Sequence, residues 1–375
     1  MHTVELAETF TSRGNKFWNH PEAVDGLRNG KPRPVVSHLM LTDTCQHSCA
    51  FCSVQTREGN SLTPEIIEGY IETLLPLGLK AVILSGGGNP ILYKQKDGYD
   101  FNSVVDYLHG VGLEIGVITN GMPLTQYGAR RSWKAVKPET LDKLTWVRIS
   151  MSGLDHKENE VYVPDVDPSK TTLGFSYVAH DIYEVPNEPN HGKVSTPEDL
   201  KQWGGKAEAI RTFEDRLPYL TSQIKQIVEK HNPRYVRLLP NCLEPEKIKF
   251  RCEQLQEMAD MIDASVVFVQ YKPPHAPPRC WLGYLHPVLN SDGYVYPCDS
   301  CVLNKAANHK FAVPWRVCKW DKIGDLYAAP AHSLIKDPAK LCPGCVFTRS
   351  NLLLQEIVDG KEIPAGSEVE HPNFV

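Results

Sequence analysis

Three cysteines lie within eight positions near the start of the chain, in the run TDTCQHSCAFC: Cys45, Cys49 and Cys52. Three thiolates this close together can hold three corners of a cubane iron–sulfur cluster and leave the fourth iron without a protein ligand. A small molecule can bind that iron, so the spacing predicts a site of chemistry. Zinc is the main alternative, but structural zinc sites usually carry two CxxC pairs, and three residues separate the first two cysteines here.

A second cysteine set follows the proline-rich run KPPHAPPR at 272–279, where six of the eleven cysteines fall within 66 positions. We expect strands at 284–290 and 294–296, joined by a turn at 291–293, to form a hairpin. Four thiolates can saturate one further cluster, and we assign them to Cys280, Cys298, Cys342 and Cys345. Cys301 or Cys318 could replace one of these ligands, and zinc is again an alternative.

The elements that would position the first cysteines are short apolar runs separated by amphipathic segments. The runs are 35–44, 80–85, 114–119, 146–150, 172–179, 235–239 and 266–271. This alternation is typical of βα units and a parallel sheet. The first run leads directly into Cys45, which places the cysteine loop at the C-terminal end of a strand, where α/β folds carry their reactive groups.

At this point the chain resembles the radical S-adenosylmethionine (SAM) superfamily, whose signature is a CxxxCxΦC loop after the first barrel strand. Phe51 occupies the aromatic position Φ. The resemblance implies an α/β fold with a partial (β/α)6 barrel. It also implies a [4Fe–4S] cluster on the three cysteines, SAM bound to its free iron, and Phe51 near the adenine.

The resemblance further implies cofactor contacts at the ends of successive strands. Ser85-Gly-Gly-Gly-Asn-Pro90 resembles the motif that binds the SAM amino group, usually Gly-Gly-Glu-Pro, with Asn89 in place of the acid. The positions that match are Gly87, Gly88 and Asn89, and Asn120 in Thr119-Asn120-Gly121 resembles a second SAM-side motif. Ser150, Ser152 and Arg237 are further candidates by their position near later strand ends. Each serine could contact ribose or carboxylate or be a turn residue, and Arg237 could face SAM or substrate.

The C-terminal cysteines resemble the domains called SPASM and twitch. Gly293 and the stretch IGDLY at 323–327 belong to this resemblance, and no cysteine follows Cys345, which favours the shorter twitch form with one auxiliary cluster. The expected organisation is an N-terminal extension at 1–34, the barrel at 35–272, a twitch-like iron–sulfur domain at 273–350 and a tail at 351–375. The polar stretch at 180–205 reads as a surface insertion, which either shapes the pocket or is incidental.

Composition is that of a globular protein: 375 residues, 41% hydrophobic and 23% charged, with a net charge of −5. This charge gives no reason to expect a nucleic-acid partner. The sequence shows no apolar run long enough for a membrane span and no signal peptide, so we expect a cytoplasmic location in which the cysteines are metal ligands rather than disulfides.

Together these features predict an enzyme that reductively cleaves SAM to a 5′-deoxyadenosyl radical. The radical would take hydrogen from a small polar metabolite (a sugar, cyclitol or nucleoside-like compound), and the auxiliary cluster would accept an electron. The resemblance implies an electron donor such as flavodoxin or ferredoxin. Only 44 residues precede Cys45, few for a leader-peptide-binding domain. The alternatives are a radical lyase, a peptide-modifying enzyme, and a structural zinc-binding interaction protein.

Overall fold

The computed structural model describes residues 6–7, 9–11, 15–47, 49, 51–52, 57–121, 136–156, 159–182, 211–242, 244–271, 279–299, 315–328 and 345–375. Ten strands form one sheet in the order β10-β9-β8-β1-β2-β3-β4-β5-β6-β7. They are β1 Val36–Leu39, β2 Ala81–Leu84, β3 Glu114–Thr119, β4 Trp146–Ser150, β5 Thr172–Ala179, β6 Tyr235–Pro240, β7 Val267–Val269, β8 Val288–Leu289, β9 Tyr294–Tyr296 and β10 Cys318–Lys319.

Strands β1 to β7 are all parallel to their neighbours and follow the chain order. This arrangement confirms the predicted α/β class. β8 pairs parallel with β1, and β9 and β10 complete an antiparallel extension of the same sheet. The strands of the C-terminal cysteine region therefore continue the barrel sheet beyond β1.

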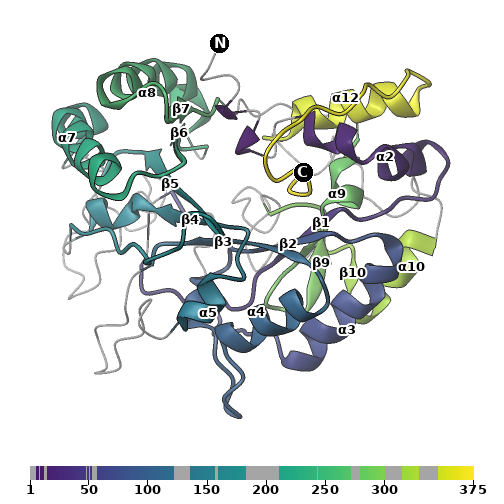
Figure 1. The fold of residues 1–375 in the computed structure, drawn as a ribbon. Coiled ribbons are helices and arrows are strands. Elements are labelled where there is room, and N and C mark those ends of the chain that lie inside the picture. The colour runs from purple at the N-terminus through teal and green to yellow at the C-terminus, as the bar shows by residue number, and fades with distance from the viewer. Residues whose placement is uncertain are drawn as a thin grey trace, which may run out of the picture.

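Helices alternate with these strands along the chain and pack against the sheet (Figure 1). The α-helices are α2 Pro21–Arg28, α3 Pro64–Leu74, α4 Phe101–Gly110, α5 Pro138–Leu141, α7 Phe213–His231, α8 Ile248–Ile262, α9 Leu282–Leu285, α10 Ile323–Ala328 and α12 Thr348–Val358. The short 3₁₀ helices are η1 Asn15–Asn19, η2 Leu75–Leu77, η3 Pro90–Leu92, η5 Met151–Asp155, η6 Pro245–Lys247 and η10 Trp320–Lys322.

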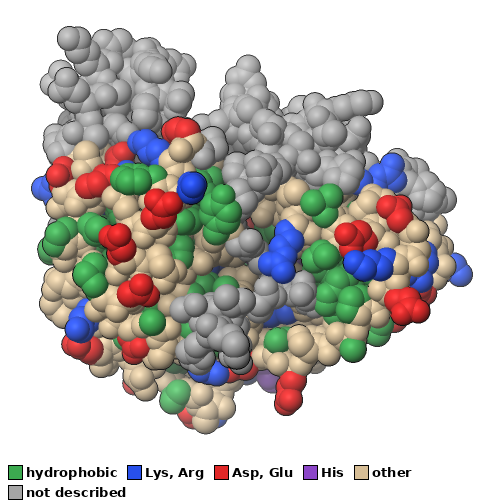
Figure 2. Space-filling model, turned by 90° about the horizontal axis from the view of Figure 1, so that it is seen from above, with side chains coloured by type: hydrophobic (Ala, Val, Ile, Leu, Met, Phe, Trp, Pro, Cys, Tyr) green, Lys and Arg blue, Asp and Glu red, His purple; other side chains and the backbone are tan. Residues whose placement is uncertain are grey.

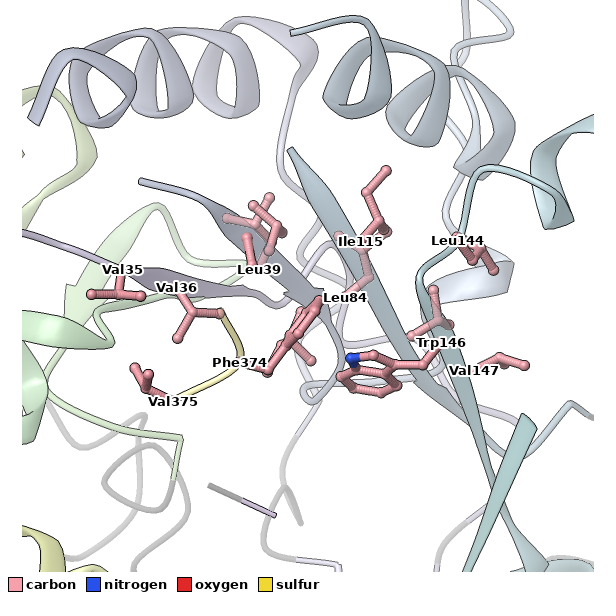
Figure 3. Packing of buried hydrophobic residues seen from close by; sticks show 14 of the residues in the cluster. Val35, Val36, Leu39, Leu84, Ile115, Leu144, Trp146, Val147, Phe374 and Val375 are labelled. Atoms are coloured by element: carbon pink, nitrogen blue, oxygen red, sulfur yellow. The ribbon is translucent and has the colours of Figure 1, made fainter. Parts of the chain in front are cut away.

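The C-terminal tail lies along the edge of the sheet at which the parallel strands begin. Phe374 packs edge-on against Trp146, the first residue of β4, with ring centroids 5.2 Å apart (Figure 3). Asn373 donates a hydrogen bond of 2.6 Å to Glu114, the first residue of β3. Lys16 donates one of 3.1 Å to the carbonyl of His371. The tail and η1 together cover the end of the barrel opposite the cysteine loop.

One predicted strand is partly wrong. Residues 284–285 belong to α9, and β8 keeps only Val288–Leu289 of the predicted run 284–290. A short apolar run does not distinguish a buried helical turn from a strand. The hairpin itself is confirmed, because β8 and β9 pair antiparallel through a turn in which Gly293 has φ +77°.

The surface carries both signs of charge. Lys and Arg side chains are interspersed with Asp and Glu over the face that Figure 2 presents. Among the described helices, none combines the length and apolar content that crossing a bilayer requires. The predicted insertion at 180–205 falls almost wholly outside the described residues, apart from its first three positions.

Candidate functional site

The cysteine loop begins just beyond the C-terminal end of β1, and its three cysteines are partly buried. Burial raises the pKa of the Cys45 thiol and raises that of Cys49 well above its usual value. Negative charge on Cys52 adds to both rises, and Cys45 adds to that of Cys49. The three sulfur atoms therefore lie close enough to repel one another as thiolates. Cations bound between them would relieve that repulsion, as the irons of a cluster do.

An amide network ties the cysteine loop to the ends of β2 and β3. Asn89 Nδ2 donates to Asn120 Oδ1 at 2.9 Å and to Gln46 Oε1 at 3.3 Å. Thr119 donates its hydroxyl proton to Asn89 Oδ1 at 2.6 Å. Asn120 Nδ2 in turn lies 3.8 Å from Cys45 Sγ. Asn89 and Asn120, both predicted to face SAM, thus lie at the cysteine loop, and Asn89 is almost wholly buried at 2% exposure.

The glycines after β2 pack against the backbone that leads into Cys45. A Cβ on Gly87 would lie 2.8 Å from the carbonyl oxygen of Thr42, and one on Gly88 would overlap the carbonyl oxygen of Thr44. Asn89 N donates to the same Thr44 oxygen at 2.8 Å. The close approach that requires glycine here is therefore to the chain's own cysteine loop. The SAM contact predicted for these glycines stays a prediction.

Three residues outside the predicted ligand and cofactor sets surround the thiols. His156 Nε2 lies 3.4 Å from Cys49 Sγ, and its ring stacks on His47 with centroids 3.9 Å apart. Arg57 donates a hydrogen bond of 2.7 Å to the His47 carbonyl, and its charge lowers the pKa of Cys45. The ligand atoms of His47, Cys49 and His156 all lie within 4.8 Å of one another, so imidazole donors stand beside the sulfurs. His47 lies inside the cysteine loop, where its position predicts a loop filler, and Arg57 is a cation five positions after Cys52, whereas His156 has no sequence signal.

Other predicted contacts occupy the same end of the sheet. Ser152 is buried and hydrogen-bonds to Cys49, which lowers the pKa of that thiol. Ser150 ends β4 and is partly buried. Phe51 meets His180, just after β5, with ring centroids 4.8 Å apart in an edge-on arrangement. Arg237, on β6, lines a cavity inside the sheet rather than the cysteine loop.

The second cysteine set is described in part. A negative charge on Cys298 contributes to raising the pKa of Cys345, which burial takes to about 11, so these two sulfurs are neighbours. Asn351 on α12 lies 3.7 Å from Cys345 Sγ and accepts hydrogen bonds from the backbone amides of Trp281 and Leu282, directly after Cys280. The described members of the set thus converge, and Cys342 and Cys301 lie outside the described residues.

Cys318 has a different environment. It lies in β10, where burial and the carboxylates of Asp325 and Asp321 raise its pKa to about 12. A thiol with such neighbours is a poor thiolate donor. Burial also raises the pKa of Cys345, so what distinguishes Cys318 is its place in β10 beside two carboxylates.

A cavity of about 240 Å³ lies inside the curved sheet. His38 of β1, Arg148 of β4 and Arg237 of β6 line it from the strands. Asp299 and Phe347 line it from the C-terminal region. Asp299 directly follows one cysteine of the second set, and Phe347 lies two positions after another. The cavity therefore extends from the barrel interior to the second cysteine set.

The residues present fit a cluster with one open iron. Three thiols converge at the end of β1, and hydrogen-bond donors from Asn120, Ser152 and Arg57 surround their loop. Such donors stabilise cluster sulfurs and thiolate ligands.

Comparison with known proteins gives a family for this part of the chain. Residues 39–165 match the model of the radical SAM superfamily. An S-adenosylmethionine-dependent nucleotide dehydratase of Selenomonas ruminantium is 28% identical over 145 residues, which are 39% of this chain and 48% of that protein. A GTP 3′,8-cyclase of Aquifex aeolicus is 31% identical over 138 residues, covering 35% of this chain and 39% of the cyclase. Each match spans less than half the length of the relative.

Among solved structures, Streptococcus suis SuiB bound to its precursor peptide SuiA aligns with 94% of this chain and 80% of its own, at 13% identity and a TM-score of 0.47. Residues 39–165 are a radical SAM segment, as the cysteine loop predicts. The matched residues include the three cysteines that we assign to a [4Fe–4S] cluster with SAM.

Proposed function

We propose that this chain is a radical SAM enzyme that removes a hydrogen atom from a small polar metabolite and oxidises the resulting radical. The observation that carries the proposal is the convergence of the three thiols at the C-terminal end of β1. A cavity inside the same sheet supports it, because its lining includes Asp299 and Phe347, sequence neighbours of the second cysteine set. Its volume of about 240 Å³ lies just below the range of roughly 300–1,000 Å³ that is typical of ligand pockets, which restricts the occupant to a small molecule. The named activities of the two relatives, on a nucleotide and on GTP, favour a nucleoside-like compound among the metabolites considered.

The thiol triplet Cys45, Cys49 and Cys52 would hold the first cluster. When bound there, the cluster supplies the electron that cleaves SAM to a 5′-deoxyadenosyl radical. The protein itself positions the cysteine loop and excludes water from the site. Asn89 and Asn120 fix the cysteine loop against the strand ends. Phe51 and Ser150 remain our assignments for the SAM side of the site.

The second cysteine set would hold the auxiliary cluster, through Cys280, Cys298, Cys342 and Cys345. A cluster with four protein thiolates has no open iron for substrate, so its suitable role is to accept an electron. Asp299 and Phe347, neighbours of Cys298 and Cys345 in sequence, line the cavity wall. This closeness supports net oxidation of the substrate, with an electron donor such as flavodoxin or ferredoxin reducing the first cluster.

Anaerobic purification tests the proposal. We expect a brown protein with about eight irons per chain, since each of two cubanes holds four. We also expect 5′-deoxyadenosine to form from SAM when a reductant is added. Deuterium transfer from labelled candidate metabolites into 5′-deoxyadenosine identifies the substrate. A colourless protein that contains zinc and leaves SAM intact would overturn the proposal.

A radical lyase is the second candidate, favoured by the dehydratase activity named for one relative. The two candidates differ in electron balance. A lyase loses water or another group from the substrate with no net electron transfer to the auxiliary cluster, whereas a dehydrogenase yields a product two electrons more oxidised. Mass spectrometry of the product separates them.

A further inference from the structure

The cavity inside the sheet contains two arginines that face the same space. Arg148 projects from β4 and Arg237 from β6, and both line the cavity. Each guanidinium feels the other, because the charge of Arg148, after the larger effect of burial, helps to lower the pKa of Arg237 to about 9. Two partly buried cations that line one cavity repel each other unless an anion lies between them.

The described residues supply little to offset these charges. Arg237 Nη1 donates a hydrogen bond of 3.1 Å to the neutral amide oxygen of Gln270. The guanidinium of Arg148 lies 5.7 Å from the ring centroid of Trp146. Within the described part of the chain, neither arginine has a carboxylate within ion-pair distance, and the Nε atom of each is buried without a hydrogen-bond partner.

The other groups around the cavity do not cancel the positive charge of the two arginines. Asp299 is the one described carboxylate among the lining residues. Its charge raises the pKa of Arg237, but burial and the charge of Arg148 lower that pKa by more. Lys16 also lines the cavity, but burial lowers its pKa to about 7, so above that pH the two arginines carry most of the positive charge. The cavity is therefore cationic and offers donors that no described group uses.

We infer that Arg148 and Arg237 form an anion subsite, and that the metabolite in the cavity carries a phosphate group which this pair binds. The inference rests on the proposed function and narrows its substrate class. A planar guanidinium matches two oxygens of a phosphate at once, and two guanidiniums offset its two negative charges. Such a subsite would bind the phosphate end of the substrate. The other end of the substrate would then point toward the strand termini at the thiol triplet.

Binding of inorganic phosphate tests the inference without any radical chemistry. The thermal midpoint of the anaerobically purified protein is followed against phosphate concentration, with ionic strength held constant by chloride. We expect a saturable rise in the midpoint for the wild type. Arg148→Gln and Arg237→Gln should each weaken apparent phosphate affinity by about tenfold or more, because each removes charged hydrogen bonds. Circular dichroism checks that both variants are folded.

Arg234→Gln is the matched control. Arg234 directly precedes β6 but is exposed, is paired with Glu370 and does not line the cavity, so its loss removes the same charge and leaves both cavity arginines in place. We expect its phosphate response to equal that of the wild type. An equal response in all three variants would overturn the anion subsite. Acetate acting as strongly as phosphate would overturn the phosphate assignment, and so would loss of the wild-type response in saturating SAM, since the arginines would then bind the SAM carboxylate.

Formation of 5′-deoxyadenosine by the wild type, measured in parallel, separates this inference from the proposed function. If the radical forms but phosphate binding does not depend on the two arginines, only the subsite is wrong. If phosphate binds as expected but SAM is never cleaved, the anion subsite stands as a binding site and the proposed enzyme activity is wrong.

Discussion

At the scale of single residues, the surroundings of the thiol triplet disfavour free thiolates. Cys45 and Cys49 are held where burial and mutual repulsion disfavour thiolates, yet Asn120, Ser152 and Arg57 direct donors or positive charge toward the loop. Free thiolates gain nothing from being crowded in this way. Bound irons reverse the balance, because they supply the positive charge that the loop lacks.

Replacing Cys49 with Ser should remove the first cluster and leave the second. We expect iron to fall from about eight to about four per chain, because one thiolate fewer no longer holds a cubane. Iron analysis and the visible absorption spectrum provide the measurement. Cys242 is exposed and lies outside both sets, so Cys242→Ser should keep the full iron content. Unchanged iron in Cys49→Ser would remove Cys49 from the ligand set.

His156 should tune the first cluster through its contact with Cys49. Hydrogen bonds to a ligating sulfur raise a cluster's reduction potential, so His156→Phe should make the potential more negative. The measurement is a redox titration followed by electron paramagnetic resonance. His109, on the exposed side of α4, serves as the control histidine, and His109→Phe should leave the potential unchanged. Equal potentials in both variants would show that His156 only packs against His47.

At the scale of elements, the cysteine loop depends on the segment after β2. Gly88→Ala should cost the protein its first cluster, because the added methyl group would overlap the Thr44 carbonyl just before Cys45. We expect iron to fall toward about four per chain. Gly110, at the end of α4, has no atom within 4 Å of an added Cβ, so Gly110→Ala should keep iron and stability. A Gly88→Ala protein with full iron would show that the loop adapts.

A buried ionic cluster joins α7 to the end of η5. Asp155 Oδ1 accepts hydrogen bonds from Arg216 and, at 2.8 Å, from the Tyr177 hydroxyl, and Oδ2 lies 3.8 Å from His180 Nε2. Arg216→Met would leave the Asp155 carboxylate buried without its cation and should cost about 3–5 kcal/mol of unfolding free energy. Urea unfolding measures this cost.

The exposed pair of Arg234 and Glu370 gives the comparison for that measurement. Arg234→Met should change the unfolding free energy by about 0–1 kcal/mol, because water and salt screen exposed pairs. A similar small cost for Arg216→Met would mean that Asp155 takes up a proton or finds another partner when the arginine is lost.

At the scale of the whole molecule, η1 and the C-terminal tail cover one end of the barrel and bury Lys16. Burial lowers the pKa of Lys16 to about 7, whereas an unfolded lysine titrates near 10.4. Between these values the unfolded chain binds more protons, so stability should rise with pH from about 7 to about 10. Lys16→Met should lose this part of the pH dependence.

Urea unfolding at pH 7 and pH 9 measures the difference between Lys16→Met and the wild type. Lys170 is exposed and paired with Asp142, so Lys170→Met serves as the control and should keep the wild-type rise. An identical rise with pH in the wild type and in Lys16→Met would contradict the predicted burial of the ammonium group.

Local sequence patterns were sufficient to predict the thiol triplet and the parallel strands. The spacing of Cys45, Cys49 and Cys52 is a property of consecutive residues, and strands of β-branched residues recur regularly along the chain. The same local patterns failed at 284–285, where a buried helical turn and a strand have equally apolar sequences. Phe51 and the glycines after β2 were identified through resemblance, and their SAM contacts remain predictions.

What the sequence alone determined was the radical SAM segment at 39–165 and the spacing on which the predicted chemistry of its cysteines rests, because these depend on residue type and short separations. Only the tertiary structure brought His156 to Cys49 and Arg148 to Arg237, residues separated by 107 and 89 positions. It also showed that Gly87 and Gly88 accommodate the chain's own backbone. Such contacts depend on how distant strands align in one sheet, and no local pattern encodes that alignment.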